Sequence, residues 1–271
     1  MSERALVVLD YSGTLSLGAV LFGRDESLLG ALQESGLWEL GVSSVQTFWQ
    51  EIVNPTWEVG STTACGYRRI LCQRVRALAE ARGLRPAAED LQARAGAFVE
   101  RYLAHSAIDA AWGPLLRDLA ARPTVTTVVA TDHYAEATAH IVAELEALGV
   151  AAAPALEGRA APFLVANSAD LGAHKADRAF WERVKSALGA GRLRRAAVVD
   201  DFGANEQPLD RYADRARVQE RVRATVEMLA GVFGAPVEVF RFWLPAGEAV
   251  MGAYRDLIRQ AGESIPRALA G

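Results

Sequence analysis

Short apolar runs alternate with longer segments of helical periodicity along much of the chain. Residues 4–9 form a mostly apolar run with β-branched members, bounded by Asp10 and a Ser-Gly pair. Such a run is typical of a strand that is buried on both faces. The same pattern predicts further strands, each followed by polar residues, at 124–130, 162–165, 195–199 and 236–243.

Apolar positions recur every three or four residues in the segments that follow these runs, which predicts helices. These segments cover residues 111–122, 135–148, 176–188, 210–229 and 248–260. Strands that alternate with helices form parallel sheets with helices on both faces. We therefore expect an α/β fold with a doubly wound parallel sheet, whose ligands bind at the carboxyl ends of the strands.

The alternation stops between residues 16 and 110. Segments 67–81 and 87–103 have helical periodicity, and no strand pattern separates them. We expect a helical domain over residues 16–110, inserted after the first strand. The core domain then consists of residues 1–15 and 111–271.

The composition is that of an ordinary globular protein, with 271 residues and a formal net charge of -4. This charge disfavours nucleic acids and anionic membrane surfaces as partners, because both usually need a basic excess. No apolar run approaches the ~20 residues of a membrane span, and the first residues do not resemble a signal peptide. Cys65 and Cys72 form no CxxC motif. We expect a cytoplasmic protein without a zinc site.

Polar residues that follow the predicted strands carry the candidate chemistry. They are Asp10 in DYSGTL, Thr131 and Asp132 in VVATDH, Lys175 in SADLGAHKADRAF, and Asp200 and Asp201 in VVDDFGAN. Lys175 is one of only two lysines in a chain that otherwise uses arginine. Two adjacent acids at the end of a buried strand repel each other unless a cation compensates them. The acidic pair therefore indicates a bound metal ion.

In their order and context, these motifs resemble those of the haloacid dehalogenase (HAD) superfamily, over residues 1–15 and about 112–205. That family has a first-strand DxDGT motif, a Ser or Thr after a second strand, a Lys at a helix start and a terminal acidic pair. The resemblance implies a HAD-like, Rossmann-type core. It also implies that the helical insertion is a cap that closes over the site. Four aromatic residues of the insertion line a pocket or form the cap's own core: Trp38, Trp49, Trp57 and Tyr67.

The resemblance also implies catalytic roles. Asp10 matches the nucleophile that attacks phosphorus and becomes a phosphoaspartate. Thr131 and Lys175 match the residues that bind the oxygens of the transferring phosphoryl group. Asp132, in the loop after Thr131, is expected to contact the substrate.

The resemblance further implies a Mg²⁺ site. Its ligands would be Asp10, the backbone carbonyl of Ser12, Asp200 and Asp201, and hard oxygen ligands suit Mg²⁺ better than zinc. Asn205 matches an amide that orients this carboxylate cluster. A turn-capping role for Asn205 stays open.

Position 12 departs from the family pattern, because phosphatases of this type carry a second aspartate there as general acid and base. Ser12 cannot shuttle protons near neutral pH, and such help is typically worth about 10² to 10⁴ in rate. We expect slow hydrolysis of alkyl phosphates unless a group from the insertion substitutes. The sequence favours a Mg²⁺-dependent hydrolase of a small phosphorylated metabolite.

Two other hypotheses stay open. Haloacid dehalogenases also lack the second acid and act on carbon without a metal, although the retained acidic pair argues against them. A catalytically weakened relative would bind a phosphorylated ligand or a protein partner without turnover, although Asp10 and Lys175 argue against it. Phosphonate-cleaving members are excluded, because residues 16–110 contain no lysine that could form a Schiff base.

Overall fold

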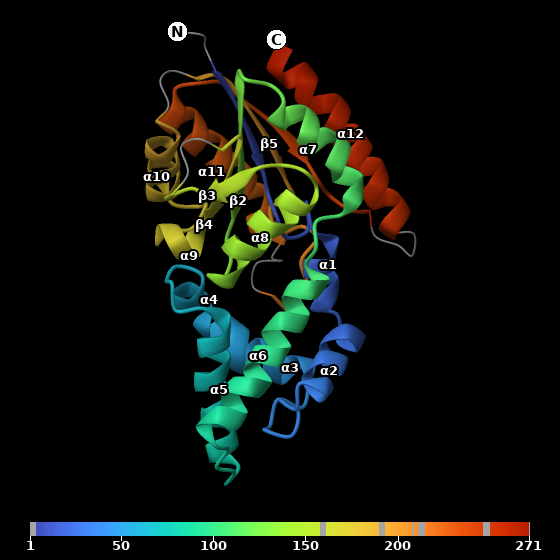
Figure 1. Cartoon of the computed structure of the whole chain (residues 1–271), viewed down its shortest axis with the longest axis vertical. Coiled ribbons are helices and arrows are strands. Elements are labelled where there is room, and N and C mark those ends of the chain that lie inside the picture. The colour runs from blue at the N-terminus through green and yellow to red at the C-terminus, as the bar shows by residue number, and fades with distance from the viewer. Residues whose placement is uncertain are drawn as a thin grey trace.

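The computed structural model describes residues 4–157, 161–189, 193–207, 209–210, 215–245 and 250–270. Figure 1 shows two parts, an α/β part that contains both ends of the chain and a helical part at the opposite end of the molecule. Residues 1–3 of the predicted core domain, residues 211–214 of the predicted helix 210–229 and residues 248–249 of the predicted helix 248–260 lie outside the described residues.

Six parallel strands form the sheet of the α/β part. They are β1 (Arg4–Leu9), β2 (Val125–Thr131), β3 (Ala152–Pro154), β4 (Phe163–Asn167), β5 (Leu193–Asp200) and β6 (Val237–Arg241). Their order is β3-β4-β2-β1-β5-β6, and every neighbouring pair is parallel. The chain builds β2, β4 and β3 on one side of β1 and β5 and β6 on the other. Ligands bind at such a switch point, at the carboxyl end of β1.

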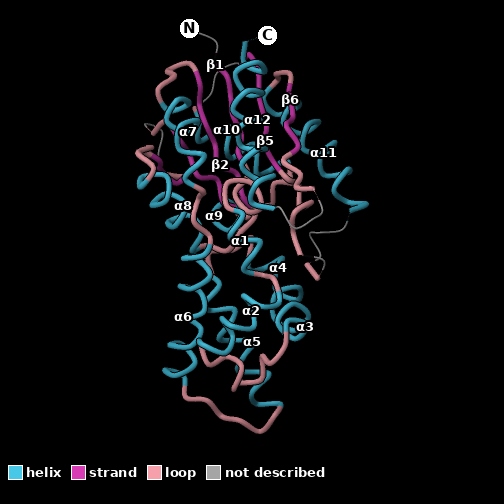
Figure 2. The backbone as a smooth tube through the Cα atoms, turned by 90° about the vertical axis from the view of Figure 1, so that its right-hand side faces the viewer, coloured by secondary structure: helices cyan, strands magenta, loops and turns pink. Residues whose placement is uncertain are grey.

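Helices cover both faces of the sheet (Figure 2). One face packs on α7 (Gly113–Ala120), α8 (Glu136–Ala147) and α12 (Val250–Ala270), and the other on α10 (Arg178–Leu188) and α11 (Arg215–Phe233). Alternate residues of β1 divide accordingly, with Val7 and Leu9 in the first cluster and Leu6 and Val8 in the second. The predicted doubly wound α/β fold is confirmed.

The elements differ from the sequence predictions mainly at their ends. The pattern missed β3, because Ala152–Pro154 contains no branched or aromatic residue that would favour a strand. The short helix α9 (Ser168–Leu171) was also missed, and α12 continues ten residues beyond the predicted 248–260 segment, to Ala270. None of these differences moves a strand end that carries a predicted site residue.

The described residues between Leu17 and His105 contain helices and no strand. The helices are α1 (Leu17–Phe22), α2 (Asp25–Glu34), α3 (Val45–Thr47), a π-helical turn (Phe48–Val53), α4 (Asn54–Gly60), α5 (Tyr67–Ala81) and α6 (Ala88–His105). They enclose a hydrophobic cluster of their own, which includes Phe48, Leu71 and Phe98. The bounds of the inserted domain, residues 16–110, stay a prediction.

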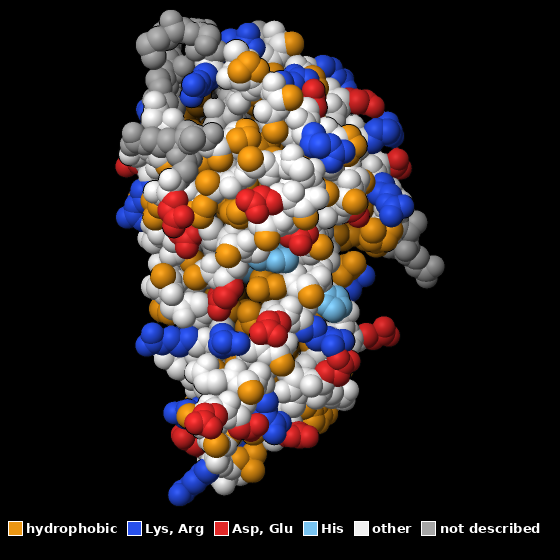
Figure 3. All heavy atoms as spheres, in the orientation of Figure 1, with side chains coloured by type: hydrophobic (Ala, Val, Ile, Leu, Met, Phe, Trp, Pro, Cys, Tyr) orange, Lys and Arg blue, Asp and Glu red, His pale blue; other side chains and the backbone are white. Residues whose placement is uncertain are grey.

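Charged side chains of both signs lie at the surface of the molecule. On the face shown in Figure 3, basic and acidic side chains are interspersed. Across the part of the chain that the structure describes, no helix combines the length and the apolar character needed to cross a bilayer.

A carboxylate of the α/β part holds the helical part in place. Glu136, at the start of α8, accepts hydrogen bonds from the backbone N–H groups of Tyr67 (2.7 Å) and Arg68 (3.1 Å). These groups begin α5 and would otherwise lack partners, so Glu136 caps a helix of the other part. Gly66 permits this approach, since its φ is +78° and a Cβ there would lie 2.7 Å from Glu136 Oε1. The Ser61 hydroxyl and His174 Nε2 make a second contact between the parts, at 2.7 Å.

We predict that Glu136→Ala loosens this junction. Loss of a helix cap costs about 0.5–2 kcal/mol, so the first amides of α5 should exchange hydrogen faster than in the parent protein. Hydrogen exchange measured by mass spectrometry tests this, with Glu146→Ala, an exposed acid on the same helix, as the control. Unchanged exchange at Tyr67 and Arg68 in the Glu136 variant would contradict the capping role.

Candidate active site

Three buried carboxylates meet at the carboxyl end of the sheet. Asp10 follows β1, Asp200 ends the adjacent strand β5, and Asp201 is the next residue. The pairing of Leu9 with Val199 places Asp10 beside Asp200. Each of the three carboxylates offers an oxygen that lies within 4.8 Å of the other two. The structure therefore brings together the three acidic side chains that the sequence assigns to the metal.

Lys175 supplies the positive charge beside these carboxylates. Its Nζ donates to Asp10 Oδ1 at 2.6 Å and to Asp200 Oδ2 at 3.0 Å. The residue lies in the loop between α9 and α10. Its backbone N–H donates to Asp132 Oδ1 at 2.8 Å, and its carbonyl accepts from Trp181 Nε1 at 2.8 Å. The two backbone hydrogen bonds thus fix the main chain at Lys175, and the two carboxylates fix the position of its ammonium group.

One ammonium group does not balance three carboxylates away from bulk water. Burial, followed by the charge of Asp200, raises the pKa of Asp10 well above its ordinary value, although Lys175 opposes the shift. Burial, followed by the charges of Glu206 and Asp200, raises the pKa of Asp201 to about 8. A divalent cation would remove this repulsion, and a donor set made only of oxygen suits Mg²⁺. The residues present therefore fit the predicted metal.

The loop after β1 fits closely against this cluster because of Gly13. Its φ is +75°, and a Cβ there would lie 2.5 Å from Asp201 Oδ2, so another residue would collide with the carboxylate. The side-chain amide of Asn205 donates to the carbonyls of Gly13 (2.9 Å) and Phe242 (2.8 Å). Its backbone N–H donates to Asp201 Oδ2 at 2.9 Å. Asn205 thus joins two loops with its side chain and contacts the acidic pair through its main chain.

Backbone N–H groups of the turn after β5 bind the carboxylates of the two acidic residues. Asp200 Oδ1 accepts from the N–H of Phe202 at 2.6 Å, and Asp201 Oδ1 accepts from the N–H of Gly203 at 2.9 Å. Phe202 has a φ of 54°, which is unfavourable for a residue with a side chain. The hydrogen bond from Arg221 Nε to the Phe202 carbonyl, at 2.9 Å, supports this conformation.

Ser12 has an acidic partner that the sequence analysis missed. Its hydroxyl donates to Glu206 Oε1 at 2.9 Å. Removal from bulk water, followed by the charge of Asp210, raises the pKa of Glu206 to about 8. Glu206 thus brings a carboxyl group of the α/β part to the side chain at position 12, whereas the sequence analysis named a group from the insertion as the substitute to consider. Its place immediately after Asn205 in the last motif was a signal that could have identified it.

A pocket of about 100 Å³ is lined by Asp10, Asp201 and Glu206 and by residues of the helical part. Thr131 and Asp132, both predicted to bind substrate, lie on its wall with Asp10, Ser12 and Lys175. Six aromatic residues also line it, and we call them the aromatic wall: Phe22, Trp49, Trp57, Tyr67, Tyr102 and Tyr134.

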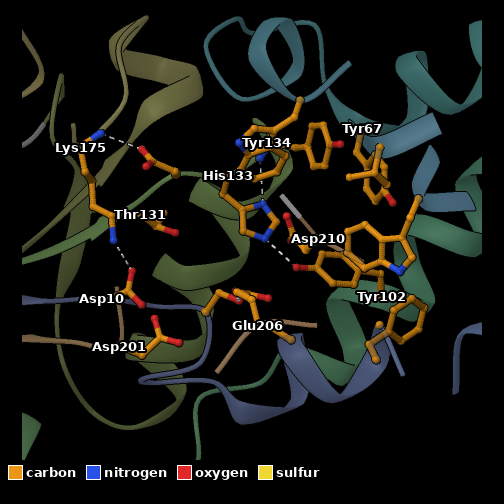
Figure 4. Close-up of a pocket in the computed structure, with 18 residues that line it drawn as sticks. Asp10, Tyr67, Tyr102, Thr131, His133, Tyr134, Lys175, Asp201, Glu206 and Asp210 are labelled. Carbon is orange, nitrogen blue, oxygen red and sulfur yellow. Dashed lines mark hydrogen bonds and ion pairs between the residues drawn. The ribbon is translucent and has the colours of Figure 1, made fainter. Parts of the chain in front are cut away.

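Figure 4 shows the labelled tyrosines opposite Asp10, Thr131 and Lys175, with Glu206 and Asp210 between the two groups. Three of the four aromatic residues that the sequence suggested for a pocket therefore line it. Trp38 does not line this pocket, and 36% of it is exposed.

His133 connects the two sides of the pocket. Its Nδ1 accepts from the backbone N–H of Tyr134 at 2.8 Å, and its Nε2 lies 2.6 Å from the Tyr102 hydroxyl. Burial, followed by His140, lowers the pKa of His133 to about 4, so the ring is neutral near pH 7. Because Nδ1 accepts, the proton is on Nε2 and is donated to Tyr102. The hydroxyl proton of Tyr102 then remains free to be donated to another group.

No protein-family model matches the chain, and no curated protein matches it. Among solved structures, it is similar to the crystal structure of a 2-haloacid dehalogenase from Pseudomonas syringae pv. Tomato DC3000. The two chains are 20% identical over 78% of this chain and 84% of the other, with a TM-score of 0.48. A similarity this distant leaves the chemistry to be argued from the residues of the site.

We predict that Mg²⁺ stabilises the protein more at pH 8 than at pH 6. Because the pKa values of Asp10 and Asp201 are raised, the folded protein without metal keeps protons that the unfolded chain has lost, so its stability falls as the pH rises toward 8. Mg²⁺ favours the deprotonated carboxylates and offsets that loss.

The measurement is the melting temperature with Mg²⁺ and with chelator at both pH values. We expect an upward shift of several degrees at pH 8, since about 1 kcal/mol corresponds to roughly 2–4 °C at this size. Asp201→Asn should reduce the shift, whereas Glu227→Gln, at an exposed position on α11, should keep it. An equal shift in both variants would place the metal elsewhere.

Proposed function

We propose that this protein is a Mg²⁺-dependent, HAD-type hydrolase that acts on a small phosphorylated metabolite through a phosphoaspartate on Asp10. The observation that supports this function is the convergence of Asp10, Lys175, Asp200 and Asp201 at one strand switch point. This arrangement combines a nucleophile, a fixed ammonium group and a place for a hard cation. Phosphoryl transfer requires these three parts.

In the first step, a carboxylate oxygen of Asp10 attacks phosphorus, and the bond from phosphorus to the leaving oxygen breaks. Lys175 holds Asp10 Oδ1, which leaves the other oxygen of that carboxylate for the attack. Thr131 lies on the same pocket wall, where its hydroxyl can donate to a phosphoryl oxygen. Mg²⁺, held by Asp10, Asp200, Asp201 and the Ser12 carbonyl, would neutralise charge on the phosphoryl oxygens.

The leaving oxygen needs a proton, and Ser12 cannot supply it from an acidic group of its own. We assign this task to Glu206, whose carboxyl group accepts a hydrogen bond from the Ser12 hydroxyl and lines the same pocket. In the second step a water molecule attacks the phosphoaspartate. The water oxygen bonds to phosphorus and loses a proton to the same carboxylate, while the bond between phosphorus and the Asp10 oxygen breaks, which releases inorganic phosphate and regenerates Asp10.

The helical unit over residues 16–110 acts as the cap in this proposal. Its aromatic side chains complete the pocket, and Glu136 ties α5 to the α/β part. Closure of this kind keeps bulk water from the phosphoaspartate and leaves the choice of substrate to the cap.

The first test is release of phosphate from a generic aryl phosphate. We expect Mg²⁺-dependent turnover that falls at least 10³-fold in Asp10→Asn, because loss of the nucleophile removes the covalent route. Asp25→Asn, at an exposed position on α2, is the control and should retain the parent rate. Halide release from a 2-haloacid without Mg²⁺ would favour the dehalogenase hypothesis, and binding of phosphate esters without turnover would favour the non-catalytic one.

The second test concerns Glu206. Glu206→Gln should slow turnover of alkyl phosphates by about 10²-fold or more and aryl phosphates far less, since an aryl leaving group needs little protonation. Ser12→Asp restores an acid at position 12, and in combination with Glu206→Gln it should recover part of the loss on alkyl phosphates. Equal losses on both substrate classes would show that Glu206 has a structural role.

A further inference from the structure

The part of the pocket opposite Asp10 has a composition that phosphoryl transfer does not require. It is formed by the aromatic wall, with Asp210 between Glu206 and the tyrosines (Figure 4). Burial raises the pKa of the Tyr102 and Tyr134 hydroxyls, and the nearby charge of Asp210 adds a smaller contribution to both shifts. Aromatic rings beside a carboxylate are the combination that binds organic cations, by attraction to the ring faces and to the negative charge.

The charge of the pocket also favours a positive group on the substrate. Five carboxylates line it, and Lys175 is the only lysine or arginine among the described lining residues. A divalent cation at the Asp10 cluster would leave this lining negative, and a phosphate dianion would add two further negative charges. A cationic group on the same substrate partly offsets that excess.

We propose that the aromatic wall and Asp210 bind the ammonium group of a phosphorylated amino alcohol, so that the preferred substrate is a phosphomonoester with a short alkylammonium chain. This inference rests on the proposed function and names the substrate class of the same site. The phosphate lies against Asp10, Thr131 and Lys175, and the ammonium group lies between Asp210 and the aromatic rings.

The test compares two substrates of nearly the same shape that differ in charge. They are 2-(trimethylammonio)ethyl phosphate and its neutral carbon analogue, 3,3-dimethylbutyl phosphate. With Mg²⁺ present, we expect kcat/KM to be at least about tenfold higher for the charged substrate, the size of effect given by a partly desolvated cation–π contact. Equal values, or a preference for the neutral analogue, would overturn the proposal.

Two variants locate the effect. Asp210→Asn should reduce the preference for the charged substrate by about tenfold. The preference is the ratio of the two kcat/KM values, so a change in the pKa of Glu206, which affects both esters, cancels from it. Trp57→Leu, at the partly exposed edge of the wall, should also reduce the preference. Glu227→Gln removes one exposed charge on α11 and should leave the preference as in the parent protein. A preference that survives both pocket variants would overturn the assignment of these residues.

A binding measurement separates failure of this inference from failure of the proposed function. In Asp10→Asn, tryptophan fluorescence titrated with each phosphate ester reports affinity without turnover, since Trp49 and Trp57 line the pocket. Tighter binding of the charged ester, without turnover by the parent protein, would support the inference and contradict the hydrolase. Turnover of the aryl phosphate with equal affinities for the two esters would support the hydrolase and overturn the inference.

Discussion

The organisation of the site is determined by the repulsion among Asp10, Asp200 and Asp201, three buried carboxylates that share one ammonium group. Like charges at this separation, away from bulk water, are costly unless a cation joins them. The parallel sheet makes the arrangement unavoidable, because the ends of the adjacent strands β1 and β5 bring these side chains together. Lys175 compensates part of the charge. The remaining repulsion favours the binding of a divalent cation at this cluster.

The loops around the carboxylates hold these side chains in place through close contacts and hydrogen bonds. Gly13 lets one loop approach Asp201 more closely than any side chain would allow. The amide of Asn205 ties that loop to the residue after β6. The left-handed conformation of Phe202 lets the turn after β5 present its N–H groups to the acidic pair. Strain and close contact are concentrated where charge is concentrated, which is common at functional sites and is not needed for the stability of the sheet.

The sequence predicted the sheet and its charged edge because both depend on local patterns. Apolar runs that end in acids located β1 and β5. Because these two strands are neighbours in the sheet, the acids at their ends lie close together. The pattern marked Glu206 only by its place after Asn205 and did not show its contact with Ser12, since that contact joins residues 194 positions apart. It also missed the contact of Glu136 with the start of α5, because backbone N–H groups leave no trace in side-chain periodicity. The aromatic wall was predicted only in part, since Phe22, Tyr102 and Tyr134 look like ordinary core residues until the fold brings them to the pocket.

The position of the acid has a consequence for substrate choice. An aspartate at position 12 would belong to the same loop as the nucleophile. Glu206 instead follows the turn after β5, and burial, followed by the charge of Asp210, raises its pKa. The leaving group must then lie between Ser12 and the aromatic wall to reach it. A leaving group in that place is surrounded by carboxylates and aromatic rings, which disfavour an anionic substituent and favour a cationic one. In the proposed reaction, the position of the acid at Glu206 therefore restricts the substrates that the pocket can accept.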